Sequence, residues 1–266
     1  MLSRAMQKID KYDFYFRAVQ CPASEIDFVT KAYSKIKGSK PKVLREDFCG
    51  TFALCCEWVK RSVENSAYGI DLDEEPLAYG RAHYLSRLKC EQQNRVHILQ
   101  KDVCGSDLPA SDLIVSLNFS YFAFKTRSQL LDYFSKCRKT LGKKGMLFLD
   151  CLGGPGTQAA HEDKVDNGDF TYYWEQVHFD ALKNEALFYI HFRPRNGSKM
   201  NKVFTYDWRI WSPIEIKEIL QEAGFRKIVF YWEGSDDQGE GNGIFKPAEK
   251  SLEELDRWVI YIGAES

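Results

Sequence analysis

The 266-residue sequence lacks the short motifs that would point directly to a metal, membrane or nucleic-acid function. It has no Cys-x-x-Cys and no His-x-x-x-His spacing, so zinc has no support and no metal is expected. No apolar run approaches the roughly 18 residues of a membrane-spanning helix, so a membrane partner is not expected. The net charge is -1, without the basic excess typical of nucleic-acid binding, which argues against a nucleic-acid partner.

The eight cysteines do not form a recognisable disulfide framework either. They are scattered, mostly in apolar surroundings, and no secretory signal peptide precedes them. This favours free thiols in a reducing compartment, so we expect a cytoplasmic protein. With 44% hydrophobic and 28% charged residues the composition is that of an ordinary globular protein. The length suits one large α/β domain, with or without an insertion.

The central stretch of the sequence is V-L-R-E-D-F-C-G-T-F, from Val43 to Phe52. Residues Val43–Glu46 are predicted to form a strand, because apolar residues lie between a proline and a Gly-Thr pair. Residues Thr51–Arg61 are predicted to form a helix with Thr51 as its cap. Strand, tight turn and helix N-terminus together form a ligand-binding unit at the carboxyl end of a strand.

A second strand is predicted at Ala67–Asp73, and it places the Asp71 carboxylate where nucleotide-binding α/β units hold ribose hydroxyls. The turn after the first strand lacks the G-x-G-x-x-G that a dinucleotide requires, which argues against a nicotinamide-dependent oxidoreductase. Glu46 and Asp47 would repel a pyrophosphate and attract an ammonium or a sulfonium. S-adenosylmethionine carries both of these cations and no phosphate.

The sequence resembles the class I S-adenosylmethionine-dependent methyltransferases. Their first motif is a strand followed by acid-x-Gly-x-Gly-x-Gly, and E-D-F-C-G-T-F has the acid Glu46 and the central Gly50, with Phe48 and Phe52 at the outer glycine positions. The motifs that follow in order are Asp71 at the end of strand two, Asp102-Val103 after strand three, Asn118-Phe119 after strand four and a glycine before strand five. The resemblance implies an α/β fold with a Rossmann-like seven-stranded sheet whose last strand is antiparallel.

The resemblance also implies S-adenosylmethionine as the cofactor. Asp102 would hydrogen-bond the adenine amino group, and Arg45 would either pair with the methionine carboxylate or form an ion pair at the strand end. Tyr15 lies in an aromatic lead-in, residues 1–23, which would cover either the cofactor or the sheet edge. The implied cofactor contacts are Tyr15, Arg45, Glu46, Asp47, Cys49, Gly50, Thr51, Asp71, Leu72, Asp102, Val103, Asn118 and Phe119.

We expect a single domain over residues 1–266, with a helical lead-in over 1–40. Caps and apolar periodicity predict helices at Ser24–Lys37, Asp73–Lys89, Thr126–Leu141 and Ser212–Gly224. Apolar runs predict further strands at Arg95–Leu99, Ser111–Leu117, Gly145–Asp150, Arg226–Trp232 and Trp258–Ile262. The acidic, glycine-rich segment Glu233–Gly243 and the loop Gly153–Gly156 are expected to be mobile.

An antiparallel insert is predicted over residues 153–211, with strands at Thr171–His178, Glu185–Arg193 and Lys202–Ile210. Placed between strand five and the next helix, it would cap the site at the carboxyl edge of the sheet and select the substrate. Its aromatic residues suit a small molecule. We expect Trp174, Tyr206 and Arg209 to bind the substrate.

Candidate catalytic residues are Asn118, Tyr121 and Tyr206. The spacing Asn118-x-x-Tyr121 is similar to the N-P-P-Y of amino-directed methyltransferases, but both prolines are missing, which favours Asn118 as a turn residue that lines the cofactor. Candidate proton acceptors or orienting groups in the insert are His178, His191, Tyr206 and Asp207.

The sequence thus predicts in-line methyl transfer to a nitrogen or oxygen nucleophile of a small molecule, in which the protein mainly aligns the nucleophile and excludes water. Two alternatives remain: a methyltransferase that acts on RNA or protein, and a non-catalytic protein that binds S-adenosylmethionine on the same fold.

Overall fold

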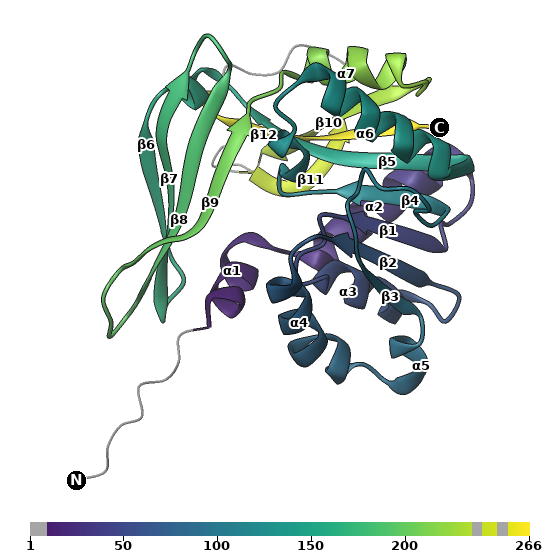
Figure 1. Ribbon diagram of the computed structural model, residues 1–266, viewed down its shortest axis with the longest axis horizontal. Coiled ribbons are helices and arrows are strands. Elements are labelled where there is room, and N and C mark those ends of the chain that lie inside the picture. The colour runs from purple at the N-terminus through teal and green to yellow at the C-terminus, as the bar shows by residue number, and fades with distance from the viewer. Residues whose placement is uncertain (1–9, 236–240, 249–254) are drawn as a thin grey trace.

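The computed structural model describes residues 10–235, 241–248 and 255–266, which form a large mixed sheet flanked by helices and a second, antiparallel sheet (Figure 1). The large sheet has eight strands in the order β11-β10-β12-β5-β4-β1-β2-β3, and the second has the order β6-β7-β8-β9. The α/β class and the separate antiparallel insert predicted from the sequence are both confirmed.

Five strands make the parallel half of the large sheet: β1 (Val43–Asp47), β2 (Ser66–Asp71), β3 (Val96–Gln100), β4 (Ser111–Ser116) and β5 (Leu141–Gly153). β1 lies between β2 and β4, with Leu44 opposite both Ala67 and Leu113. β4 is buried almost throughout, as its nearly continuous apolar sequence predicts for a central parallel strand. The polar residues that follow β1, β2 and β4 therefore meet at one edge of the sheet.

The other half of the large sheet contains antiparallel pairs. β12 (Trp258–Glu265) lies between β5 and β10 (Ile228–Ser235) and is antiparallel to both, which confirms the predicted antiparallel last strand. An eighth strand that the prediction lacked, β11 (Gly241–Pro247), pairs with β10 at the sheet edge. The prediction of a mobile loop over residues 233–243 is therefore wrong at both ends of that segment, which belong to β10 and β11. Its centre, residues 236–240, lies outside the described residues.

Helices cover both faces of the large sheet. The buried side chains of α2 (Pro22–Lys37), α3 (Ala53–Arg61) and α4 (Glu74–His83) share one core cluster. Those of α6 (Arg127–Thr140) and α7 (Pro213–Glu222) belong to another. Figure 1 shows α6 and α7 together on one side and α2 and α3 on the other. Three single helical turns are also present: η1 (Leu85–Arg87), α5 (Cys90–Gln93) and η2 (Ser120–Ala123), of which η2 contributes the buried Tyr121 and Phe122.

The predicted caps of three helices are confirmed. The Asp73 side chain accepts from the N–H of Glu75, and Thr126 and Ser212 open capping boxes. Three other boundaries are wrong. The helix predicted from residue 24 begins at Pro22, which suits a first helical position because its missing N–H needs no partner there. α3 begins after Phe52, without a side-chain cap from Thr51. α4 ends at residue 83 rather than 89.

The insert has four strands, not three: β6 (His161–Asp166), β7 (Phe170–Asp180), β8 (Glu185–Pro194) and β9 (Met200–Arg209). β6 was missed because its sequence H-E-D-K-V-D has one apolar residue and is mostly exposed. The preceding glycine-rich segment contains the turn η3 (Pro155–Gln158), whose Gly156 N–H donates to the carbonyl of Asp256, so it is not a free loop. Phe188 and Trp208 pack into the main core.

The N-terminal helix α1 (Lys11–Val19) lies between the insert and α4 (Figure 1). Phe14 stacks on Phe170 of the insert with ring centroids 4.2 Å apart. Tyr12 packs on Tyr79 of α4 at 4.8 Å. The aromatic lead-in is thus a bridge between two parts of the fold, although its residues 1–9 lie outside the described residues.

All eight cysteines are unpaired, as the sequence indicated. None of the helices in the described ranges has the length and apolar character needed to cross a membrane.

Candidate active site

A cavity of about 400 Å³ lies where β1, β2 and β4 end, closed above by α1 and by β9 of the insert. It is thus at the edge of the sheet where α/β folds bind ligands, and its size falls in the range of small-molecule sites. The predicted residues that line it are Tyr15, Glu46, Asp47, Cys49, Gly50, Thr51, Asp71, Asn118 and Tyr206. The sequence did not predict a role in this cavity for Gln20, Glu25, Asp73 or Thr205, which also line it.

The turn after β1 has left-handed backbone at each of the three positions where the resemblance expects glycine. The φ angles are +58° at Phe48, +50° at Gly50 and +46° at Phe52. A bulky side chain in this region costs about 1–3 kcal/mol, so surrounding contacts must hold the turn. One such contact is the N–H of Gly50, which donates to Asp71 Oδ2 at 2.8 Å. The backbone path of the motif is therefore present even though two glycines are not.

A second strained turn follows β4. Asn118 and Phe119 have φ angles of +55° and +56°, and their N–H groups both donate to the carboxylate of Asp150, at 2.6 and 2.8 Å. Burial raises the pKa of Asp150 to about 7, while these two bonds act in the opposite direction. Asp150 holds the turn that brings Asn118 to the cavity. Asp150 was not among the predicted site residues, because its partners lie some thirty residues away in the sequence.

Two glutamates of the cavity are titratable near neutral pH. Burial raises the pKa of Glu46 to about 8, although its side chain accepts a hydrogen bond from the N–H of Cys55 at 3.2 Å. Burial likewise raises the pKa of Glu25, on α2, to about 7. The Glu25 carboxylate also raises the pKa of Glu46 and of Asp150 through repulsion. The cavity is therefore a place where the negative charge of carboxylates is poorly solvated.

The charge of the cavity has one sign. Six of its lining residues are acids, and none of the described lining residues is Lys, Arg or His. Asp47 pairs with Arg45, and Asp207 pairs with Lys125. Within the described ranges the other four acids have no cationic partner: Glu25, Glu46, Asp71 and Asp73. Such a site attracts cations and disfavours phosphates and carboxylates.

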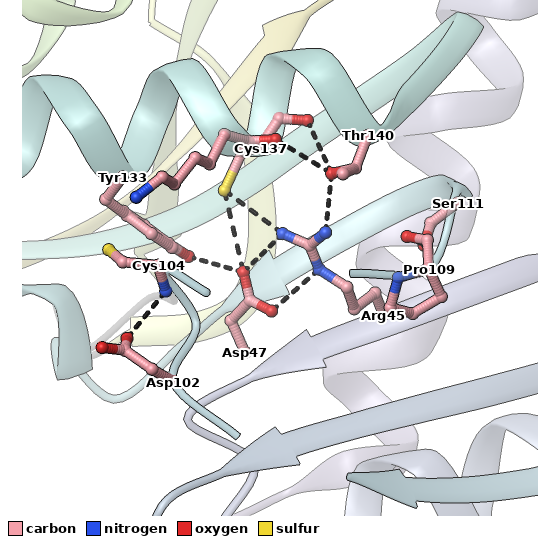
Figure 2. A network of polar contacts seen from close by, with 10 residues as sticks. Arg45, Asp47, Asp102, Cys104, Pro109, Ser111, Tyr133, Cys137 and Thr140 are labelled. Atoms are coloured by element: carbon pink, nitrogen blue, oxygen red, sulfur yellow. Dashed lines mark hydrogen bonds and ion pairs between the residues drawn. The ribbon is translucent and has the colours of Figure 1, made fainter. Parts of the chain in front are cut away.

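Arg45 does not line the cavity. Because residues i and i+2 of a strand share a face, Arg45 and Asp47 both point toward α6, whereas Glu46 points away. The guanidinium is 0% exposed and holds Asp47 with bonds of 2.8 and 2.9 Å (Figure 2). Thr140 and Tyr133 complete this network at 2.6 and 3.0 Å. The geometry favours the ion pair over the cofactor contact, and it fixes the end of β1.

Aromatic residues of α1 and β9 form the roof. A hydrogen bond joins the hydroxyls of Tyr15 and Tyr206, and the ring of Tyr15 lies 5.0 Å from that of Phe204. Burial raises the pKa of Tyr15 to about 12 and that of Tyr206 well above its usual value. Both phenols therefore stay protonated at neutral pH and can orient a ligand, but they are poor bases.

Several predicted site residues lie elsewhere. Tyr121 is fully buried and donates to the carbonyl of Asp150 at 2.7 Å, so its hydroxyl does not reach the cavity and a catalytic role has no support. Arg209 places its guanidinium 3.7 Å from the ring centre of Trp211 and bonds Glu215. It is held by α7 rather than turned to the cavity, so the expected substrate contact has no support.

Five other predicted contacts, four with the cofactor and one with the substrate, lie beyond the cavity. Leu72 is exposed, and Asp102 accepts a hydrogen bond from the N–H of Cys104 at 2.7 Å (Figure 2). Val103 is buried in the main core. Phe119 and Trp174 line a different cavity. The contacts of these five residues with cofactor or substrate stay predictions.

Two candidate histidines lie outside the cavity. His178 is exposed, and His191, on β8, bonds Glu175 at 2.7 Å and accepts from the N–H of Lys202 at 2.8 Å. His191 belongs to a group with Glu162 and Glu175, whose oxygen and nitrogen atoms lie within 4.8 Å of one another and could hold a metal ion. Both ring nitrogens of His191 already have partners, so the group is explained as part of the insert's own structure.

Comparison with solved structures assigns the fold. The order β3-β2-β1-β4-β5-β12-β10, with β12 antiparallel, is that of the class I S-adenosylmethionine-dependent methyltransferases, and the described chain has this fold. No protein-family model and no curated protein matches the sequence.

Three structures illustrate the likeness. An S-adenosylmethionine-dependent methyltransferase from Clostridium acetobutylicum is 17% identical, with a TM-score of 0.70 over 96% of each chain. DesVI from Streptomyces venezuelae is 18% identical, with a TM-score of 0.68 over 97% of this chain and 100% of that one. The amino pentose methyltransferase CalS10 from Micromonospora echinaspora, solved with bound S-adenosylmethionine, is 14% identical, with a TM-score of 0.67 over 97% and 98%.

Proposed function

We propose that this protein transfers a methyl group from S-adenosylmethionine to a nitrogen or oxygen atom of a small molecule. The observation that carries the proposal is the acidic cavity at the ends of β1, β2 and β4, whose described lining contains six acids and no Lys, Arg or His. A ligand with two cationic groups and no phosphate fits that charge. The side-chain amide oxygen Oε1 of Gln20 is buried at the cavity and has no hydrogen-bond donor among the described residues, which leaves a further acceptor for a ligand.

The residues of the chain divide the work of holding this cofactor. Glu46 would attract its ammonium, and Asp71, whose oxygens can each accept a second bond, would hold the ribose hydroxyls. Tyr15 would cover it from α1, while Leu72, Asp102 and Val103 would lie along the adenine. When bound, S-adenosylmethionine supplies a methyl group already activated by its sulfonium. The protein then needs to align the acceptor, exclude water and take up a proton.

Within this proposal we favour nitrogen as the nucleophile. An amine arrives as an ammonium ion, which the same acids attract, and it must lose a proton before it can attack. Glu25 has a pKa raised to about 7 by burial, which suits a general base near neutral pH. Tyr206 stays protonated and would orient the acceptor together with Asn118. Both line the cavity, with Tyr206 on β9 of the insert.

The acceptor class follows from the roof of the cavity. Phe204, Tyr206 and Trp208 of β9 close the space above the acids and leave room for a compact molecule rather than a polymer. The similar KedS8, 17% identical with a TM-score of 0.63 over 100% of this chain and 96% of that one, is described as a sugar N-methyltransferase from Streptoalloteichus. Together with the amino pentose enzyme above, this supports a small amine, with amino sugars as the first class to test. We also expect the protein to be cytoplasmic.

The test is transfer of label from S-adenosylmethionine to amino sugars, other small amines, small alcohols, RNA and protein. We expect label in a small amine. Glu25→Gln should lower kcat with little change in the affinity for S-adenosylhomocysteine, and Tyr206→Phe should raise KM. Glu64→Gln, an exposed acid paired with Lys42, is the matched control and should behave as wild type. Replacing the whole insert is less informative, because its Phe188 and Trp208 belong to the main core.

Three outcomes would contradict the proposal. Label that enters only RNA or protein would favour the macromolecule-directed alternative. S-adenosylhomocysteine binding without transfer to any acceptor would favour a binding protein. Calorimetric binding of NADH but not of S-adenosylhomocysteine would exclude the cofactor itself.

A further inference from the structure

A second cavity, of about 360 Å³, lies at the ends of β5, β10 and β12 beneath the insert, and the proposed methyl transfer uses none of it. The two cavities are separated by a wall of neighbouring residues. Asn118 lines the first cavity and Phe119 the second. Trp208 lines the first and Trp174 the second, with ring centres 5.9 Å apart. A ligand in the second cavity is therefore bound by its own set of residues.

Indole rings make the apolar part of this second cavity. Trp232 and Trp258 lie side by side, with centroids 5.9 Å apart and planes tilted by 52°. A Cβ at Gly153 would be only 2.2 Å from Cη2 of Trp258, so the indole rests on the bare backbone of β5. Trp174 lines the cavity from the insert and is stacked on Phe188 at 4.9 Å. The rings are thus fixed by their neighbours and still half-exposed to the cavity.

A buried polar group without a partner lines the same space. Gln176 is 1% exposed; its Nε2 donates to the carbonyl of Thr157 at 2.6 Å, and its Oε1 has no donor among the described residues. The His161 Nδ1 lies 3.1 Å from the carbonyl of Ala159, and its Nε2 lies 3.3 Å from Oδ2 of Asp163, so both ring nitrogens have polar neighbours. A buried acceptor such as the Gln176 Oε1 normally has a donor, so a ligand is a natural source for one.

The charges of the second cavity are largely compensated, in contrast with the first. Asp163 pairs with Arg257 at 3.2 Å, and Glu233 accepts the N–H of Gly243 at 2.6 Å. The guanidinium and the indole N–H groups add hydrogen-bond donors to the acceptors above. A lining that offers flat apolar rings, donors and acceptors together suits a ligand whose ring has an apolar C–H face and whose hydroxyls both donate and accept.

We infer that the second cavity binds a neutral, polyhydroxylated ring of the saccharide type, at a site distinct from the acidic cavity. A quaternary ammonium could also lie against the indoles, but it would leave the Oε1 of Gln176 without a donor. A phosphorylated sugar would meet the like charge of Glu233, which has no cationic partner among the described residues. The inference does not depend on methyl transfer, because none of the residues that carry it lines the first cavity.

The test is a calorimetric titration of the full chain with methyl hexopyranosides and disaccharides, followed in parallel by tryptophan fluorescence. Tetramethylammonium, glycerol and a hexose phosphate serve as comparison ligands. We expect saturable binding of a glycoside, with little binding of the comparison ligands, and the same affinity when S-adenosylhomocysteine is present in excess. Titration with S-adenosylhomocysteine alone tests the proposed cofactor separately on the same sample.

Three variants locate the site. Trp232→Ala should weaken glycoside binding at least tenfold, and Gly153→Ala should do the same by displacing the indole of Trp258 without removing a ring. Trp58 is a buried tryptophan in the core cluster formed by α2, α3 and α4. Trp58→Phe is therefore the control for the fluorescence signal and should bind the glycoside with the wild-type affinity. Thermal unfolding checks that each variant is folded. If Trp232→Ala does not fold, the glycoside affinity of Gly153→Ala tests the site instead.

The inference is overturned if no glycoside gives saturable binding or if tetramethylammonium binds in its place. It is also overturned if the variants leave the glycoside affinity unchanged, or if S-adenosylhomocysteine displaces the glycoside, since either result would place the ligand in another cavity.

Discussion

The ring of Phe52 occupies the space in which Gly80 has no side chain. A Cβ at Gly80 would be 2.5 Å from Cε1 of Phe52 and 2.3 Å from the carbonyl oxygen of Thr51. The turn after β1 therefore accommodates a phenylalanine at a motif position where glycine is usual, because α4 places a glycine opposite it. This pairing explains how the methyltransferase fold persists with an altered motif.

Gly80→Ala should destabilise the protein, because the added methyl overlaps both the ring and the turn. We expect a loss of about 1–3 kcal/mol in the free energy of unfolding, measured by urea denaturation. Phe52→Leu added to Gly80→Ala should recover part of the loss. The control is Gly142→Ala, where a Cβ would meet only the carbonyl of Ser111 at 3.9 Å. Equal effects of the two alanine substitutions would contradict the pairing.

The left-handed backbone at Phe48 predicts an unusual order of stabilities. At a position with ordinary backbone angles, a variant with glycine is less stable than a variant with alanine, because glycine leaves the unfolded chain more conformational freedom. At Phe48, with φ +58°, we expect Phe48→Gly to be more stable than Phe48→Ala by about 1 kcal/mol. Both variants lose the same ring, so the difference measured by denaturation isolates the backbone. A more stable alanine variant would show that the turn is not left-handed.

The Arg45–Asp47 pair should be structural. Arg45→Met leaves the Asp47 carboxylate buried without its cation, which costs about 3–5 kcal/mol when a buried pair is broken. Adding Asp47→Leu should restore much of the stability. Arg81→Met removes the exposed pair with Glu74 and is expected to change stability by less than about 0.5 kcal/mol.

The same variants separate the two interpretations of Arg45. If Arg45 only holds Asp47, folded Arg45→Met should bind S-adenosylhomocysteine with nearly the wild-type affinity in a calorimetric titration. A loss of affinity in the double variant Arg45→Met/Asp47→Leu, with stability restored, would instead support contact with the methionine carboxylate.

Much of the fold could be predicted, because local signals determined it. The central strand β4 has a nearly continuous apolar sequence, and the capping boxes at Thr126 and Ser212 mark the starts of α6 and α7. The strands of the insert alternate or carry aromatic residues. Because parallel strands end at one edge, the order of acids after the strands also placed Glu46, Asp71 and Asn118 together.

What could not be predicted depends on tertiary contacts. β6 and β11 pair through their backbones with neighbouring strands, and their own sequences carry little apolar pattern. Glu25 reaches the cavity from a helix that the sequence assigned to core packing. The direction of Arg45 could have been foreseen, since alternation along a strand places it with Asp47 on the face opposite Glu46.

Asp71 should be essential for cofactor binding. Its carboxylate accepts the N–H groups of Gly50 and Asp73 at 2.8 and 2.9 Å, so it organises the turn as well as offering oxygens to a ribose. Asp71→Ala should weaken S-adenosylhomocysteine binding by about 1.5–3 kcal/mol, roughly 10- to 150-fold, by calorimetry. Asp112→Ala is a matched control, because Asp112 also accepts two backbone N–H groups, of Lys42 and Val43, away from the cavity. Equal affinity in the two variants would place the nucleotide elsewhere.

Glu46 should make the stability of the ligand-free protein depend on pH. Its pKa is about 4.3 in an unfolded chain and is raised by burial to about 8 in the folded one. Between these values the folded state binds more protons than the unfolded state, so the contribution of Glu46 to stability is greatest below about pH 4.3 and falls as the pH rises toward 8. Glu25 and Asp150, each raised to about 7, add to the same slope.

Glu46→Gln tests this contribution. The variant should lose stability less steeply between pH 5 and pH 8, and at pH 8 it should exceed wild type by at least about 1.4 kcal/mol, the equivalent of one pKa unit. Denaturation curves across this range measure the slope, with the exposed Glu64→Gln as control. Because a bound cation favours the ionised carboxylate, the affinity of wild type for S-adenosylmethionine should rise over the same range, and that of Glu46→Gln should stay flat. Parallel slopes for wild type and Glu46→Gln would show that Glu46 is ionised throughout and that the cavity does not suppress its charge.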